Sequence, residues 1–217
     1  MPSPIDVYWQ LRLESVAKEL KANSFEVFLA QTAAEAGELI LKTLIPKIKP
    51  KVVSWGGSMT IGATGVTEAI LKKGTFTVIN PYEAGIKPEE SYERRRQGLL
   101  ADLFITGTNA LTEQGQLVNL DATGNRVGAI NFGPKNVILA IGRNKIVPDL
   151  ETAFNRVKDV AAPINAIRLG RKTPCVSTAV CQDCKSPDRI CNVWTVTEKS
   201  FPKGRIRIVL INQDLGY

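Results

Sequence analysis

Short apolar runs alternate with helical patterns along most of the chain, and this alternation constrains the fold more than any other feature. Strands are predicted at residues 25–29, 52–55, 75–80, 101–105 and 136–141. Helices are predicted at 5–20, 32–44, 88–100 and from 148 onward, with a weaker pattern up to residue 73. Such alternation is typical of a parallel sheet covered by helices. We therefore predict an α/β fold with a mostly parallel sheet.

Proline should interrupt two of these helices, and two short strands should follow them. Thr32 and Glu35 form a capping-box pattern at the start of a helix through residue 44, a segment that Pro46 and Pro50 should end. Pro163 should kink or interrupt the long helix that opens at residues 148–149. The apolar runs at 193–196 and 205–211 are predicted strands that pair with each other or with a sheet edge.

The segment 106–126 is polar and glycine-rich, and it directly follows a predicted strand. Ligands bind beyond the carboxyl ends of strands in α/β domains, so this segment is the first candidate site. Its candidate ligand-binding residues are Gly107, Thr108, Asn109, Gly124 and Asn125. The alternative interpretation is a pair of glycine- and asparagine-rich turns that join short strands, one of them at 115–120.

Three ionisable residues are candidates for catalysis. Glu113 or Asp121 could act as a base or nucleophile, and Lys145 could stabilise developing negative charge. For Glu113 the alternative is an ordinary solvated turn residue. Asp121 and Asn125 could equally fix turns through bonds from the side chain to the backbone.

A second candidate for ligand binding is the turn formed by Gly56, Gly57, Ser58 and Thr60. A glycine-rich turn between a strand and a helix exposes backbone N–H groups that favour an anion, and the two hydroxyls add donors. An anionic small molecule is therefore an expected partner, and a plain Gly-Gly turn capped by serine is the alternative. The spacing is neither a P-loop nor a dinucleotide fingerprint, so no nucleotide cofactor is predicted.

The sequence contains no histidine. This absence excludes Ser-His and Cys-His nucleophilic catalysis and metal ligation through imidazole. The net charge of +7 is compatible with acidic partners but is scattered along the chain, so we do not expect nucleic-acid binding. No apolar run is long enough to span a membrane, and residues 1–6 lack the features of a signal peptide. We therefore expect a cytoplasmic protein with no membrane partner, which could form a homo-oligomer.

All four cysteines, Cys175, Cys181, Cys184 and Cys191, lie in one polar stretch. A loop this poor in apolar residues cannot become ordered through burial and needs a cross-link. Cytosolic thiols are kept reduced, so the cluster indicates a metal or iron–sulfur site instead of disulfides. Unligated thiols are the alternative. Structural zinc and a [4Fe–4S] cluster both remain open. We divide the chain into an α/β domain at residues 1–170 and a cysteine-rich loop with terminal strands at 171–217, packed on the same domain.

Longer motifs extend from about residue 5 to the end of the sequence. They are Gly57-Ser58-Met59-Thr60, Gly107-Thr108-Asn109-Ala110, Thr112-Glu113, Gly115, Asn119, Asp121, Gly124-Asn125-Arg126, Phe132-Gly133-Pro134, residues 144–149, Ala161-Ala162-Pro163 with Asn165, and the cysteine segment 181–192. Together they resemble the lactate-utilisation (LUD) domain family, in the branch with an added four-cysteine loop. The resemblance implies a three-layer α/β fold similar to the sugar-isomerase and CoA-transferase group. It also implies lactate oxidation alongside partner proteins that hold iron–sulfur clusters.

Two functions are compatible with these observations. The first is a component of a cytoplasmic lactate or hydroxyacid oxidation system, with an iron–sulfur cluster or zinc on the four cysteines. The alternative is a carboxylate-based isomerase or transferase that acts on a phosphorylated or CoA-linked small acid. In that case the 56–60 turn would bind the anionic group.

Overall fold

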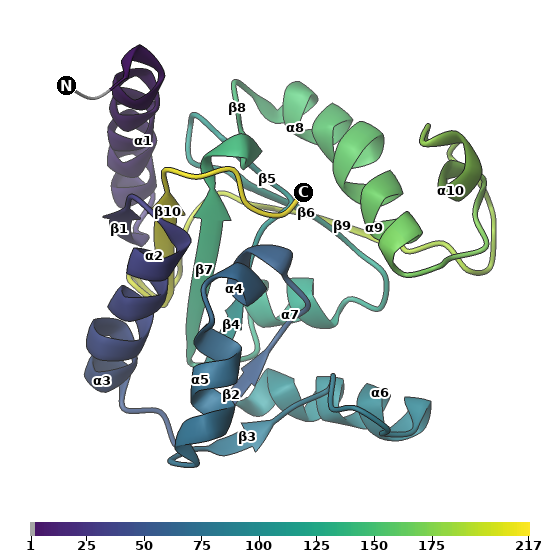
Figure 1. Ribbon diagram of the computed structural model, residues 1–217, viewed down its shortest axis with the longest axis horizontal. Coiled ribbons are helices and arrows are strands. Elements are labelled where there is room, and N and C mark those ends of the chain that lie inside the picture. Colours follow the sequence, from purple (N-terminus) through teal and green to yellow (C-terminus); the bar gives the residue numbers. More distant parts are fainter. Residues whose placement is uncertain (1–2) are drawn as a thin grey trace.

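The computed structural model describes residues 3–217 and has a large parallel sheet at its centre (Figure 1). Met1 and Pro2, which belong to the segment judged to lack signal-peptide features, lie outside the described residues. The six strands of the large sheet are, in spatial order, β1 (Glu26–Ala30), β10 (Ile206–Ile211), β7 (Asn136–Gly142), β4 (Leu103–Thr106), β2 (Val52–Trp55) and β3 (Thr77–Ile79). Every pairing among them is parallel, which confirms the predicted α/β class.

The last strand of the chain lies inside this sheet. β10 pairs with β1 on one side and with β7 on the other, so the prediction that it would pair with the preceding strand or at an edge is wrong. Five of its six residues are buried, and Ile206, Ile208 and Leu210 face one layer while Val209 and Ile211 face the other. An apolar run buried on both faces is typical of an interior parallel strand.

A second sheet of four strands lies beside the first. Its order is β8 (Ile146–Val147), β5 (Ala110–Thr112), β6 (Leu117–Asp121) and β9 (Val193–Thr197). β5 and β6 form the hairpin expected around residues 115–120, and Gly115 takes a positive φ of 82° in its turn. β9 joins the free edge of β6 in antiparallel fashion, as the sequence predicted for a terminal strand.

Helices cover both faces of the large sheet. One face packs against a layer made of α2 (Ala33–Leu39), η1 (Ile40–Leu44), α3 (Ile45–Ile48), α4 (Met59–Ala63) and α5 (Val66–Lys73). The other face packs against α1 (Pro4–Ala22), α7 (Asn125–Asn131) and the β5–β6 hairpin. The outer face of the small sheet packs against α8 (Leu150–Arg156) and η4 (Val157–Ala161). Within the described residues, no helix combines the length and the apolar character needed to cross a membrane.

The remaining helices connect these layers. They are α6 (Pro88–Gln97), η2 (Gly98–Leu100), η3 (Arg143–Lys145), α9 (Ala162–Arg168) and α10 (Pro174–Thr178). α6 follows β3 along the chain and buries none of its side chains. α9 continues α8 and η4 and leads into the cysteine-containing segment (Figure 1).

Pro46 and Pro163, the two prolines expected to interrupt helices, each follow a π-helical turn. The helix that begins after Thr32, whose side chain accepts a bond from the Glu35 N–H, does not end at Pro46 but continues to Ile48. Just before Pro46, the N–H of Ile45 bonds the carbonyl of Ile40. The π turn η4 precedes Pro163 in the same way. Proline has no N–H to donate to the carbonyl four residues earlier. In the wider π turn each N–H bonds the carbonyl five residues earlier, so the helix can continue past the proline.

We predict that Arg205 makes one of the largest single contributions to stability. Its guanidinium is buried and donates to the carbonyls of Ala129, Ile130, Phe132 and Pro134 at 2.6–3.0 Å, which closes the carboxyl end of α7. Arg205→Met leaves these carbonyls without a donor and should lower the free energy of unfolding by about 3 kcal/mol or more. Urea unfolding measures the change.

The matched control is Arg96→Met, because Arg96 lies on the exposed surface of α6 and pairs only with Glu93. This change should alter the free energy of unfolding by less than about 0.5 kcal/mol. Equal effects of the two substitutions would contradict the assignment.

Candidate functional site

A pocket of about 200 Å³ opens beyond the carboxyl ends of the parallel strands. Each of five neighbouring strands sends its following loop to this pocket. The loops contribute Gly57 and Ser58 after β2, Tyr82 after β3, Gly107 to Asn109 after β4, Lys145 after β7 and Tyr217 after β10. The residues around Asp121, at the end of β6, and the helices η4 and α9 complete the wall. This position is where α/β sheets bind ligands.

Most of the residues selected from the sequence meet in this pocket. Gly57, Ser58, Gly107, Thr108, Asn109, Asp121, Asn125 and Lys145 all line it. Gly56, Thr60 and Gly124 lie directly behind the lining. Thr60 is fully buried and bonds Lys145, and Gly124 begins α7 with a φ of 84°.

The loops after β2 and β4 touch, and this contact requires glycine. A Cβ on Gly107 would lie 2.7 Å from the hydroxyl of Ser58, and one on Gly56 would lie 2.8 Å from the hydroxyl of Thr106. Both separations are shorter than a carbon–oxygen contact allows. The two glycine-containing turns therefore form one surface rather than two independent sites.

Glu113 does not join the other candidates. It follows β5 at the opposite end of the hairpin, and its carboxylate forms an ion pair with Arg12 of α1. Its side chain is 40% exposed, as the alternative interpretation of a solvated turn residue expected. Its position therefore gives no support to a catalytic role in this pocket.

Asp121 lines the pocket, but its carboxylate is occupied by the backbone. Oδ1 accepts from the N–H of Ala122 at 3.0 Å, and Oδ2 accepts from the N–H groups of Arg126 and Val127 at 3.0 and 3.3 Å. These bonds fix the turn that leads from β6 into α7. Asp121 thus positions the chain at the pocket wall, in agreement with the turn-fixing alternative.

Lys145 is a buried amine in the wall of the pocket. The side chain is 4% exposed, and Nζ donates to the hydroxyl of Thr60 at 3.0 Å and to the carbonyl of Thr108 at 3.1 Å. Burial, reinforced by the positive charges of Arg156 and Arg126, lowers the pKa of Lys145 to about 7. The amine therefore exchanges its proton near neutral pH.

Two arginines at the pocket, Arg126 in its lining and Arg156 behind it, hold positive charge against neutral acceptors. Arg126 is 9% exposed, and its guanidinium bonds the carbonyls of Gly107 and Leu120 and the side-chain oxygens of Asn109 and Asn119, at 2.6–3.3 Å. Arg156 donates to the carbonyls of Asn109 and Asn144 at 2.6 and 3.1 Å. None of these acceptors carries a charge, so the pocket retains a positive potential.

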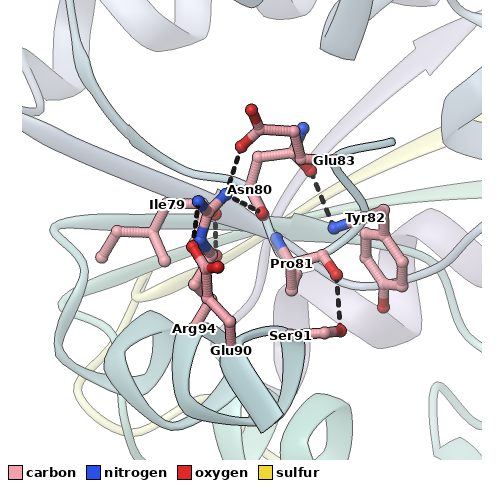
Figure 2. Close-up of polar contacts among 9 residues, drawn as sticks. Ile79, Asn80, Pro81, Tyr82, Glu83, Glu90, Ser91 and Arg94 are labelled. Carbon is pink, nitrogen blue, oxygen red and sulfur yellow. Dashed lines mark hydrogen bonds and ion pairs between the residues drawn. The ribbon is translucent and has the colours of Figure 1, made fainter. Parts of the chain in front are cut away.

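The loop after β3 brings Tyr82 to the rim of the pocket. Helix α6 anchors this loop (Figure 2), because Arg94 donates to the carbonyl of Asn80 at 2.9 Å and pairs with Glu83, while Ser91 donates to the carbonyl of Pro81 at 2.7 Å. The hydroxyl of Tyr82 accepts from the N–H of Gly57 at 2.7 Å. Burial of this hydroxyl raises the pKa of Tyr82.

Several lining residues were not selected from the sequence. They are Tyr82, Arg95, Arg126, Asn165, Arg168, Arg171 and Tyr217. Arg126 and Asn165 stand inside the motifs quoted above. The guanidinium of Arg95 lies 5.7 Å from the centre of the Tyr82 ring. The lining thus carries five basic side chains, and among the described residues Asp121 is its one carboxylate.

All four cysteines line a second, smaller cavity beside the first. Ala162 and Ile190 line both cavities, so the two share a wall. The cysteines are free thiols. Across residues 3–217 no three or more His, Cys, Asp or Glu side chains are grouped closely enough to hold a metal ion. The four cysteines therefore line one cavity, but their side chains are not arranged as a metal site.

Polar bonds tie the cysteine segment to the rest of the molecule. Asp188 accepts from Arg171 at 3.0 Å and from the N–H of Lys172 at 2.7 Å. Asn192 donates from its backbone to the carbonyl of Asp121 at 3.0 Å. Arg189 donates to the carbonyls of Cys184 and Cys191 at 2.6–3.1 Å. Arg189 thus bridges two of the four cysteines through their backbone carbonyls.

Comparison with known proteins extends these observations. The chain is similar in fold to a DUF162 family protein from Deinococcus radiodurans, with a TM-score of 0.51 and 14% sequence identity over 97% of this chain and 100% of that chain. Its alignment with eIF2B delta from Chaetomium thermophilum covers 65% of this chain and 50% of that chain at 15% identity. The TM-score of this alignment, 0.28, is too low to indicate a shared fold. No curated protein matches the chain at a significant level.

The sequence comparison confirms the resemblance drawn from the motifs. Residues 13–211 match the LUD domain, a span that includes both sheets, the cysteine cavity and all of the pocket lining except Tyr217. The chain therefore belongs to the LUD domain family.

Proposed function

We propose that this LUD-domain protein binds a small organic acid of the lactate type in its pocket, as a cytoplasmic component of hydroxyacid oxidation. One observation carries the proposal: Arg126, Lys145 and Arg156 place positive charge at the pocket and bond only neutral acceptors. Asp121 offsets part of the charge of Arg126 without bonding its guanidinium, and a bound carboxylate would supply further negative charge to these buried cations.

The size and the lining of the pocket favour a small polar ligand. Its volume of about 200 Å³ is below the range typical of drug-sized ligands. Ser58, Asn125 and Asn165 offer neutral donors and acceptors for a hydroxyl group, and Arg168 and Arg171 add charge. A hydroxyacid needs both kinds of contact.

The cysteine cavity is proposed to hold zinc or an iron–sulfur cluster. The residues fit such a group in their donor chemistry, because four cysteines line one cavity and Arg189 and Lys158 lie beside them. Cys175, Cys181, Cys184 and Cys191 would be the ligands. Zinc would contribute folding energy, and a cluster would carry electrons. The shared wall at Ala162 and Ile190 would place either group next to the acid pocket, where iron–sulfur partner proteins would also have to dock.

A second candidate function is an isomerase or transferase acting on a phosphorylated or CoA-linked small acid. The five basic side chains of the lining favour it, because they exceed the charge of one carboxylate. The backbone bonds to Asp121 weigh against a carboxylate base, so Lys145 would have to carry the proton transfer.

Lys145→Met should weaken the binding of lactate by about tenfold or more, because it removes a buried cation from the pocket. Isothermal titration measures the affinity. Lys72→Met removes an exposed lysine outside the pocket and should leave the affinity unchanged. If the wild-type protein binds phosphoglycerate but not lactate, the second candidate function replaces the first.

The affinity for lactate should fall as pH rises through about 7. Below the pKa of Lys145, which is about 7, the amine is charged before the ligand arrives. Above it, binding must also recover a proton, so the dissociation constant should rise by up to about tenfold per pH unit. Titrations across this range should show the trend in the wild-type protein and a flat profile in Lys145→Met. A flat wild-type profile would contradict the role given to Lys145.

Cys184→Ser should abolish metal binding, since it removes one of four thiolate ligands. Elemental analysis and the visible spectrum of anaerobically purified protein distinguish zinc from an iron–sulfur cluster. Ser177→Ala changes an exposed residue of the same segment and should retain the metal. Folded wild-type protein with four titratable thiols and no metal would refute the site.

A further inference from the structure

We propose that Lys145 forms an imine with the carbonyl carbon of a small α-keto acid bound in the pocket. This inference rests on the proposed function and specifies the substrate class, because an α-keto acid is the oxidised form of a hydroxyacid. It gives Lys145 a covalent role instead of a purely electrostatic one.

The hydrogen bonds of Lys145 leave one direction free for bonding. Thr60 donates its hydroxyl hydrogen to the carbonyl of Leu215 at 3.0 Å, so its oxygen can only accept from Nζ. The carbonyl of Thr108 is also only an acceptor. A neutral amine has two N–H bonds and one lone pair. Because both N–H bonds point to these acceptors, the lone pair occupies the remaining tetrahedral position of Nζ. Lys145 itself lines the pocket.

The surroundings of Lys145 favour the neutral amine. Within residues 3–217 no carboxylate lies at ion-pair distance from Nζ, and both bonded acceptors are uncharged. Burial and the nearby charges of Arg156 and Arg126 bring the pKa of Lys145 to about 7. A nucleophilic lysine needs this combination of desolvation and neighbouring cations.

The same cations would orient the acid. In an α-keto acid the carboxylate is bonded directly to the carbonyl carbon, so a carboxylate held by the basic lining places that carbon near Nζ. Nζ attacks this carbon and forms the C–N bond. Both amine hydrogens then leave with the carbonyl oxygen as one water molecule, so the step needs no oxidant, reductant or other reactant.

The test is reductive trapping. Wild-type protein is incubated with pyruvate or glyoxylate and sodium cyanoborohydride, which converts an imine into a stable secondary amine. Intact-mass measurement should show one adduct per chain, and peptide mapping should place it on Lys145. Lactate, which has no carbonyl group beside its carboxylate, should compete and reduce the trapping.

Two matched variants complete the experiment. Lys145→Arg keeps a positive charge but cannot form an imine, so the adduct should disappear. Lys72→Arg changes an exposed lysine outside the pocket and should retain it. An adduct that is absent from Lys145, or spread over surface lysines of the wild-type protein, would overturn the inference.

Titration of pyruvate without reductant separates this inference from the proposed function. If pyruvate and lactate bind but Lys145 is not trapped, the imine is wrong and the acid-binding pocket stands. If neither acid binds and no adduct forms, the proposed function fails as well.

Discussion

Arg126 carries its positive charge in the interior of the molecule, and every acceptor that its guanidinium bonds is neutral. Desolvation of such groups opposes folding, so the backbone must compensate with many hydrogen bonds. The loops that end β4 and β6 supply these bonds through Gly107 and Leu120. Arg126 thus joins the large sheet to the small one, and the bonds that hold its charge also set the shape of the pocket.

The parallel sheet explains why residues far apart in sequence meet at this charge. Five neighbouring strands end at the same edge, so their following loops converge without any long excursion. Helix α6 holds the Tyr82 loop at the rim of the pocket, because Arg94 and Ser91 bond the backbone of this loop (Figure 2). The cysteine segment closes the opposite side, where Ile190 contacts both cavities. The two candidate sites are therefore parts of one architecture.

Local sequence patterns predicted most of the helices and strands, but they predicted less well which strands pair and which side chains meet. The strand at 136–141 and the capped helix after Thr32 follow rules of burial and hydrogen bonding within a few residues. Pro46 lies inside a helix because a π turn accommodates it, which no local rule anticipates. Glu113 and Asp121 share a polar segment, but a hairpin places them at opposite ends. The sequence around Arg95 does not indicate that its guanidinium lies over the ring of Tyr82, because that contact depends on tertiary structure.

The interior position of β10 has a consequence for how the chain is made. Among the described strands, β1 pairs only with β10, so the first strand has no partner until residues 206–211 have left the ribosome. Until then the apolar side of α1, with Leu13, Val16 and Leu20, lacks the completed layer it will cover. Contacts of such long sequence separation slow folding. β3, β2, β4 and β7 can pair with one another before β10 has been translated, but β1 can join the sheet only after it.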